Sequence, residues 1–290
     1  MGNVIRMDLY RLVKSMSFKV CLIIVFLLNI IEGPLGKIMF NLGKKLAEQN
    51  EDPEKALAQL GEWDNTFHFG NILADQLGMI CTALFLLCIV WFCYSDIQHG
   101  YIKNIAGQLP SRGHTIISKF VVIQFTTLLF YVVTVIGNTA GQLMVGRKMV
   151  FDMRIAGEFD EDTLTRAEDK IFSMGSALGE FAIKWLLLTG VCALVLLLTT
   201  AVGSNVAGTI VAILCGAGFT GLAYTGISAG INKLFKFKKD FELSNYMPDS
   251  LYRTNLNDEG CMMRALVVAV ITIFVLMYVT TRMYNKKDIK

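Results

Sequence analysis

Few residues of this sequence have the types and spacing that catalysis requires. The sequence contains no G-x-x-x-x-G-K-[ST] loop for phosphate binding, no G-x-S-x-G nucleophile motif and no H-E-x-x-H zinc motif. Its three histidines are His68, His99 and His114, and His99 follows Asp96 by three residues, which on a helix puts both on one face. Two ligands are too few for a metal site. We therefore expect no metal, no cofactor and no P-loop hydrolysis of nucleotide in this chain.

Ionisable side chains are also scarce within the long apolar stretches. Carriers driven by protons or ions keep such groups near the middle of the membrane, whereas Glu32, Asp75 and Lys184 each fall near the end of an apolar stretch. The sequence therefore offers no proton relay. Asp75, beside Asn71 and Gln76, either marks a helix end that reaches water or contacts a polar or cationic group of a cargo.

The composition is that of a membrane protein. Of the 290 residues, 54% are hydrophobic and 18% are charged, and the mean hydropathy is +0.51, whereas soluble domains are about 25% charged. A helix needs roughly 20 apolar residues to cross about 30 Å of hydrocarbon, and no A-x-A-like cleavage site follows the first apolar stretch. We predict an all-α integral membrane protein with a single transmembrane domain over residues 1–290. Its six spans lie near residues 18–36, 70–93, 120–145, 182–202, 206–229 and 265–281.

The seven cysteines indicate neither a disulfide framework nor a metal site, because no C-x-x-C pair occurs. They are Cys21, Cys81, Cys88, Cys93, Cys192, Cys215 and Cys261. All except Cys261 lie inside or at the edge of a predicted span, so we expect them to pack as small apolar side chains.

Lys and Arg are distributed unevenly among the segments outside the spans. Each of three segments has more basic than acidic residues, whereas the other three are acidic when taken together. The basic segments are 1–19, 95–119 and 282–290, and the others are 37–68, 146–181 and 231–264. Because basic segments stay in the cytoplasm, we expect both termini and segment 95–119 to be cytoplasmic.

Short helices are predicted outside the spans. Residues 4–16 place apolar side chains on one face and basic ones largely on the other, which is typical of an amphipathic helix in the inner membrane interface. Structured extracellular segments follow the odd-numbered spans. Asp52 before Pro53 predicts a helix start there, and the acidic run at 160–162 predicts a second one.

The fifth predicted span is rich in glycine and is followed by alternating basic and aromatic residues. Gly226 and Gly230 have the G-x-x-x-G spacing that lets helices pack closely, and the alternative interpretation is that they line a path for cargo. The alternating residues are Phe235, Lys236, Phe237, Lys238, Lys239 and Phe241. At the edge of a span they indicate an interfacial anchor, or a short helix that dips back toward the membrane, rather than a nucleic-acid site.

Residues 94–119, "YSDIQHGYIKNIAGQLPSRGHTIISK", are too long and too patterned for a simple connection between two spans. They predict a short amphipathic helix from about Tyr101 to Gln108, with breaks at Gly100 and Pro110. Because a push on a short crosswise helix tilts both neighbouring spans, we interpret this segment as the point where a partner protein performs work on the chain.

The segment resembles the inward loop of bacterial type-2 ABC transporter permeases, in which an acidic residue precedes a G-T-I-K-N run, an S-R pair and an S-K pair. The matching residues here are Tyr94, Asp96, Gly100, Ile102, Lys103, Asn104, Ser111, Arg112, Ser118 and Lys119. Tyr101 departs from the usual Thr, Asp96 from the commoner Glu, and Pro110 from a common Gly. The amphipathic N-terminal helix, six spans and cytoplasmic termini resemble the same family in layout.

This resemblance implies partners, a cofactor and a location. The family's permease pairs with a second permease half, identical or related, and with two copies of a separate ABC ATPase subunit. That subunit binds ATP and Mg²⁺ and receives the short helix in a surface groove. The residues implied in this contact are Asp96, Gly100, Tyr101, Lys103, Asn104, Gln108 and Arg112. The chain would be no enzyme by itself and would lie in the bacterial cytoplasmic membrane, in contact with lipid.

Two functions are therefore expected. The leading hypothesis is a permease subunit of an ATP-binding-cassette exporter that moves an amphipathic or apolar cargo by alternating access. The first candidate cargo is an antimicrobial or toxin-like peptide, for export or self-immunity. The alternative is a non-transporting membrane scaffold or sensor that anchors an ATPase.

Overall fold

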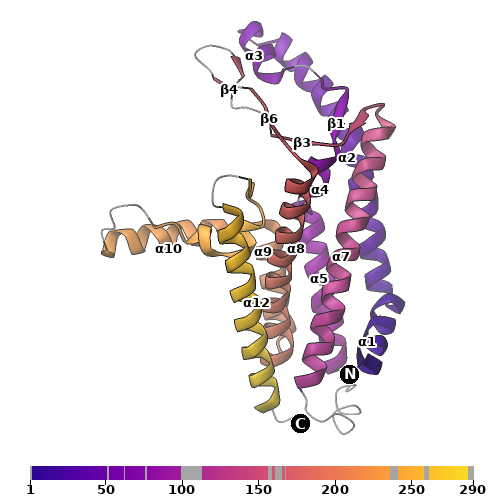
Figure 1. The fold of residues 1–290 in the computed structure, drawn as a ribbon, viewed down its shortest axis with the longest axis vertical. Helices are drawn as coiled ribbons and strands as arrows, with labels where there is room; N and C mark the ends of the chain where they lie inside the picture. The colour runs from indigo at the N-terminus through magenta and orange to yellow at the C-terminus, as the bar shows by residue number, and fades with distance from the viewer. Residues whose placement is uncertain are drawn as a thin grey trace. The chain divides into compact units, whose positions relative to one another are not determined.

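A computed structural model describes most of the chain, and it is largely helical, as predicted (Figure 1). The described residues are 2–50, 52–61, 63–75, 77–98, 113–155, 159–160, 165–166, 168–235, 241–257 and 261–286. Within these ranges, five helical segments are long and apolar enough to cross a membrane, or up to six if a bent pair of helices counts as one span. The five are Met16–Glu48, Phe69–Ser95, Gly113–Met144, Met174–Thr200 and Cys261–Lys286. These helices are compatible with a multi-pass membrane protein.

The chain divides into two compact units. The first unit comprises Met1–Ile23, Gln76–Tyr131 and Ala182–Lys290, and the second comprises Ile24–Asp75 and Val132–Phe181. Because compactness alone does not define a domain, the single domain expected over residues 1–290 stays a prediction.

The first unit is a helical bundle around an aromatic core. Its elements are α1 (Gly2–Lys14), α5 (Met79–Gln98), the π-helical turn η1 (Leu197–Val202), α9 (Asn205–Ala217), α10 (Thr220–Phe235), the 3₁₀ turn η2 (Leu243–Tyr246), α11 (Pro248–Leu251), α12 (Cys261–Lys286) and parts of α2 (Met16–Glu48), α7 (Gly113–Met144) and α8 (Met174–Leu196). The ring of Phe130 lies 6.0 Å from that of Phe18 and 4.9 Å from that of Phe85, between centroids. A Cβ added to Gly216 would lie only 2.5 Å from the Cα of Ala83, so α9 and α5 pack closely.

The second unit combines the remaining parts of α2, α7 and α8 with short elements. These are α3 (Pro53–Leu60), β1 (Thr66–His68), α4 (Phe69–Ala74), β2 (Lys148–Val150), β3 (Met153–Ile155), β4 (Phe159–Asp160), β5 (Thr165–Arg166) and β6 (Lys170–Phe172). Strand β1 pairs with β2 in parallel, whereas β3 with β6 and β4 with β5 are antiparallel. A small core of Ala74, Met153 and Ala177 joins α4, β3 and α8.

Helices α2 and α7 approach each other through glycines in the second unit. A Cβ on Gly141 would overlap the carbonyl oxygen of Ile30, and one on Gly33 would overlap the carbonyl oxygen of Gly141. A Cβ on Gly137 would come within 3.0 Å of the Cβ of Asn29. Gly137 and Gly141 therefore form a G-x-x-x-G contact that larger residues would force apart.

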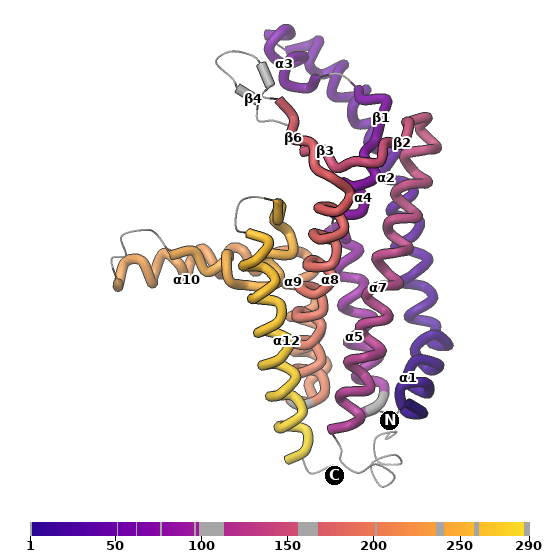
Figure 2. The backbone as a smooth tube through the Cα atoms, viewed as in Figure 1, coloured from indigo at the N-terminus to yellow at the C-terminus, as the bar shows by residue number. Residues whose placement is uncertain are grey.

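Five of the six predicted spans correspond to long helical segments, but the fifth is broken. Helix α9 ends at Ala217, Gly218 adopts the left-handed conformation at φ 78°, and α10 then runs at 85° to α9 (Figure 2). The break lies inside the stretch 206–229, which apolar composition marks as one continuous span.

The short elements agree with the sequence only in part. The amphipathic helix expected at 4–16 is α1, and the helix expected at Pro53 is α3, although the Asp52 side chain does not cap it. The prediction of a helix that starts at the acidic run 160–162 is wrong for the described residues, because β4, β5 and β6 occupy this region. Aromatic and β-branched residues such as Phe159 and Ile171 favour paired strands, and acidic residues alone do not specify a helix.

Candidate functional site

Most of the predicted coupling segment lies outside the described residues. Gly100, Tyr101, Lys103, Asn104, Gln108, Pro110 and Arg112 all belong to 99–112, and Asp96 lies in the last turn of α5. The site is therefore defined by the helices on either side of this segment, α5 before it and α7 after it, and by α1 and α12, which contact α7.

A buried hydrogen bond ties α1 to the beginning of α7. Asp8 is 2% exposed, and its Oδ2 atom accepts a hydrogen bond of 2.6 Å from the hydroxyl of Ser118, which is fully buried. The guanidinium of Arg11 lies 3.9 Å from the other carboxylate oxygen. A buried carboxylate is costly unless it is hydrogen-bonded or paired, so these contacts hold α1 against α7.

Two further contacts fix the same end of α7. Lys119 is 2% exposed and its Nζ atom lies 4.7 Å from the centroid of the Phe92 ring on α5, a cation–π contact. The N–H of Gly113, the first residue of α7, donates to Oδ1 of Asn285 on α12 at 2.7 Å. Asn285 thereby satisfies one of the free N–H groups of a helix N-terminus.

We call these seven residues the inner frame: Asp8, Arg11, Phe92, Gly113, Ser118, Lys119 and Asn285. They join α1, α5, α7 and α12 where residues 99–112 leave α5 and enter α7. Sequence reasoning found Ser118 and Lys119 through the S-K pair but assigned no role to Asp8. A lone acid in a basic amphipathic helix was the available signal.

A second group of polar side chains stabilises the corner between α9 and α10. The guanidinium of Arg253 donates from one nitrogen to the carbonyl oxygens of Cys215 and Gly216, at 2.8 and 2.5 Å. These carbonyls end α9 and have no partner within the helix. An unsatisfied backbone group inside a membrane costs several kcal/mol, so Arg253 permits α9 to end where it does.

The other side of the corner is held by Asp249, which is 5% exposed. Its carboxylate accepts hydrogen bonds from the hydroxyls of Thr220, at 2.5 Å, and Tyr224, at 2.9 Å, in the first turns of α10. Nearby, the hydroxyl of the buried Tyr252 accepts a bond of 2.8 Å from the N–H of Leu77, before α5. Burial raises the pKa of Tyr252 to about 12, so its hydroxyl stays neutral.

The residues predicted to line a cargo path lie in different units. Asp75 follows α4 in the second unit, is exposed, and donates its backbone N–H to the carbonyl of Asn71 at 2.8 Å. It is close enough to Glu32 for the two charges to interact. Gly226 and Gly230 lie on α10 in the first unit, and a Cβ on either would meet no described atom within 4 Å. The tight packing expected for these glycines is therefore absent among the described residues.

Comparisons with models of known protein families and with curated proteins gave no match.

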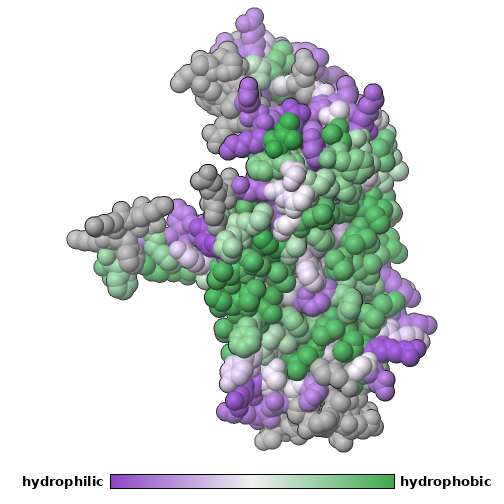
Figure 3. Space-filling model, in the orientation of Figure 1, coloured by the Kyte–Doolittle hydropathy of each residue, from purple (hydrophilic) through white to green (hydrophobic). Residues whose placement is uncertain are grey.

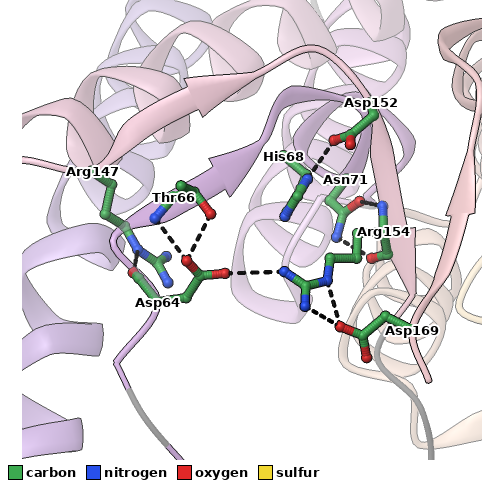
Figure 4. A network of polar contacts seen from close by, with 8 residues as sticks. All are labelled: Asp64, Thr66, His68, Asn71, Arg147, Asp152, Arg154 and Asp169. Carbon is green, nitrogen blue, oxygen red and sulfur yellow. Dashed lines mark hydrogen bonds and ion pairs between the residues drawn. The ribbon is translucent and has the colours of Figure 1, made fainter. Parts of the chain in front are cut away.

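A polar network in the second unit connects the segment before β1 with the strands that follow α7 (Figure 4). The carboxylate of Asp64 accepts two hydrogen bonds from Thr66, from its N–H at 2.8 Å and its hydroxyl at 2.7 Å. Arg154 lies 3.6 Å from Asp64 and also pairs with Asp169. Partial burial by itself would raise the pKa of Asp64, but the bonds from Thr66 and the charges of Arg147 and Arg154 hold it below its usual value.

The same network fixes β3 against α4. His68 pairs with Asp152, and the side-chain amide of Asn71 binds both the N–H and the carbonyl of Arg154, each at 2.7 Å. Arg147 donates to the carbonyl of Asp64 at 2.8 Å. In the described part of the chain, no group of three or more His, Cys, Asp or Glu could hold a metal ion. The network is thus a set of paired charges that stabilises the folded segment.

Proposed function

We propose that this chain is the membrane subunit of an ATP-driven exporter, which moves an amphipathic or apolar cargo while a separate ATPase hydrolyses ATP. In this proposal residues 99–112 contact the ATPase, the termini lie in the cytoplasm of a bacterium, and the chain works with a second permease half. ATP and Mg²⁺ bind to the partner, and Asp96, Lys103 and Arg112 lie at the junction.

The inner frame is the observation that carries the proposal. A lever transmits force only if its ends are rigidly attached, and the helices that flank residues 99–112 are attached by two buried contacts and one partly buried hydrogen bond. Ser118 binds Asp8, Lys119 lies over Phe92, and Gly113 binds Asn285. A push on the segment would therefore move α1, α5, α7 and α12 together.

The outward part of α2 supports an apolar or amphipathic cargo. Four large apolar side chains near its C-terminal end are between 50% and 64% exposed: Ile38, Met39, Leu42 and Leu46. Beyond a span of roughly 20 residues, such side chains have no hydrocarbon to cover them. Asp75, an exposed carboxylate at the end of α4, supplies negative charge in the same unit, which suits a cargo that carries both apolar and cationic groups, such as a cationic peptide.

Co-expression with the ATPase encoded beside its gene tests this function. The purified complex should hydrolyse ATP, and inverted vesicles that contain it should accumulate a labelled cationic amphipathic peptide only when ATP is present. An ATPase that binds the chain without any peptide movement would instead identify the chain as a scaffold or sensor. Failure of the ATPase to bind would exclude both.

Ser118→Ala separates a coupling role of the inner frame from a structural one. If the frame transmits force, this variant should bind the ATPase normally but move several-fold less peptide for each ATP hydrolysed. Thr126→Ala is the matched control, because among the described residues the Thr126 hydroxyl donates to the carbonyl of Val122 within α7 and to no other helix. Equal loss of ATPase binding and of transport in Ser118→Ala would indicate general damage to the fold.

A further inference from the structure

Helix α10 has a polar face that is fixed along its whole length. Four polar side chains recur at every fourth residue: Thr220, Tyr224, Ser228 and Asn232. The first two bind Asp249, as described above. The hydroxyl of Ser228 accepts from the N–H of Leu243 at 2.9 Å, and the side-chain amide of Asn232 binds both backbone groups of Phe241, at 2.8 and 3.1 Å. The segment 241–249 therefore covers this face.

The other side of α10 is apolar and uncovered by any described residue. Leu222 and Leu234 are each 79% exposed, and Ile227 is 50% exposed. Gly226 and Gly230 lie among them with open space beside their Cα atoms. Figure 3 shows hydrophobic residues along the lower side of α10 and hydrophilic ones above its junction with α9.

The direction and depth of α10 match those of a helix at a membrane surface. Helix α9 has 13 residues and is therefore about 20 Å long, whereas the hydrocarbon is about 30 Å thick. An α9 that begins at one boundary of the hydrocarbon and runs along the membrane normal would end about 10 Å short of the far boundary. The 85° bend between α9 and α10 would then direct α10 into the plane of the membrane, where interfacial helices bury their apolar face by about 5–10 Å.

We propose that α10 is a lipid-binding interfacial helix, whose apolar face (Leu222, Ile227 and Leu234) contacts acyl chains of one leaflet while its polar stripe binds segment 241–249. This leaflet is the one farther from Asn285, because α9 ends beside the beginning of α5, near Ala83, and Gly113 and Asn285 mark the opposite end of the unit. Lys233 in the last turn of α10 can extend toward lipid phosphates. The proposal is independent of any ATPase.

Lipid is a better occupant of this face than a second copy of the chain. A strip about 24 Å long and about 10 Å wide offers about 240 Å², whereas a stable protein interface takes about 800 Å² from each partner. Acyl chains can contact aliphatic side chains and glycines, and a headgroup phosphate can contact a single lysine. Neither contact requires a specific geometry.

Depth-dependent quenching tests the proposal on the full chain. Leu234→Cys and Ile227→Cys, each labelled with the fluorophore NBD, are reconstituted at one chain per nanodisc with phosphatidylcholine spin-labelled at a shallow or a deep acyl position. We expect blue-shifted emission that falls about twofold with the shallow label and less with the deep one, because the helix lies near the headgroups. All seven native cysteines are buried, so the unsubstituted chain gives the labelling background.

Two control positions calibrate the measurement. Phe274→Cys on α12, where Phe274 is 73% exposed, reports a position in a predicted span and should respond most to the deep label. Lys55→Cys on α3 reports an exposed outward position and should respond to neither. Water-like emission without quenching at Leu234 and Ile227 would overturn the proposal. Protection from water that appears only with two chains per disc would also overturn it, because a second copy would then cover the face.

Discussion

Two glycine pairs with identical spacing have opposite surroundings in this molecule. Gly137 and Gly141 on α7 touch the backbone of α2, whereas Gly226 and Gly230 on α10 have open space where a Cβ would lie. The G-x-x-x-G spacing permits close packing but does not create a partner. On α7 the spacing fixes two helices, and on α10 it leaves a smooth apolar surface.

The two regions are also stabilised in different ways. The α2–α7 contact rests on backbone atoms that cannot move aside, so any added side chain displaces a helix. Among the described residues, helix α10 is held from one side, by hydrogen bonds from its polar stripe and by Arg253 and Asp249 at its corner with α9. Substitutions should therefore have large effects at the first region and graded effects at the second.

Alanine at Gly141 should have the largest effect. Its Cβ would overlap the carbonyl oxygen of Ile30, and overpacking of this kind costs about 3 kcal/mol. The thermal unfolding midpoint of the purified protein in detergent measures this loss. Gly36→Ala is the matched control, because a Cβ on Gly36 meets no described atom within 4 Å and alanine favours a helix by up to about 1 kcal/mol. Equal midpoints for the two variants would contradict the close contact.

Substitution of Arg253 by methionine should have the next largest effect. It removes two charge-assisted hydrogen bonds to the last carbonyls of α9, which costs about 2 kcal/mol. The unfolding midpoint should fall, and amide hydrogen exchange should increase in α9 and α10 before it increases in α2. Lys148→Met, at an exposed strand position, serves as the charge control. If exchange in α9 and α10 stayed unchanged, Arg253 would not hold the corner.

Asp64→Asn should produce a smaller and pH-dependent effect. The folded-state pKa of Asp64 is below its unfolded value, so its stabilising contribution is present above about pH 4 and is lost as the pH falls through the folded-state pKa. Because Asp64 is 43% exposed at its side chain, solvent screening limits this contribution to less than about 1 kcal/mol. Wild type and variant should differ in midpoint at neutral pH and converge in strong acid. A difference that grew in acid would reverse the assigned sign.

Leucine at Gly226 should have the smallest effect. The site has open space, so the change in stability should stay within about 0.5 kcal/mol, and the added side chain should enter the lipid face of α10. The thermal midpoint and the mass of the particle in detergent together check this result. A large loss of stability, or the loss of a dimer, would show that Gly226 packs against a partner in the same way as Gly141.

Much of the fold follows from composition, because a run of about 20 apolar residues has few alternatives to a span. The break in the fifth span could not be found in this way. It depends on Arg253, which binds the last carbonyls of α9, and on Asp249, which binds side chains in the first turns of α10, both from more than 20 residues further along the chain. No local pattern records such a contact, and Gly218 alone is an ambiguous signal because this stretch contains many glycines.

The sequence predicted where the candidate site lies along the chain, but it predicted few of the contacts that form the site. The pattern of residues 94–119 indicated a special segment, and the charge of Asp8 was visible, but burial of that charge depends on its meeting Ser118 across 110 positions. The motif at Gly226 and Gly230 drew attention ahead of the one at Gly137 and Gly141, because a glycine-rich surrounding stands out more than a packed pair. The G-x-x-x-G spacing identifies candidate helix contacts, and the residues that surround each pair in the fold determine whether a contact forms.

ATP hydrolysis by the reconstituted complex tests the central claim most directly. The complex of this chain and its neighbouring ATPase should lose binding, peptide-stimulated hydrolysis or both when residues 103–108 are replaced by a Gly/Ser linker of equal length. An equal-length replacement of residues 54–59 in α3 should leave both unchanged. If the linker at 103–108 binds the ATPase and supports turnover as the native chain does, residues 99–112 do not transmit work and the exporter mechanism proposed here is contradicted.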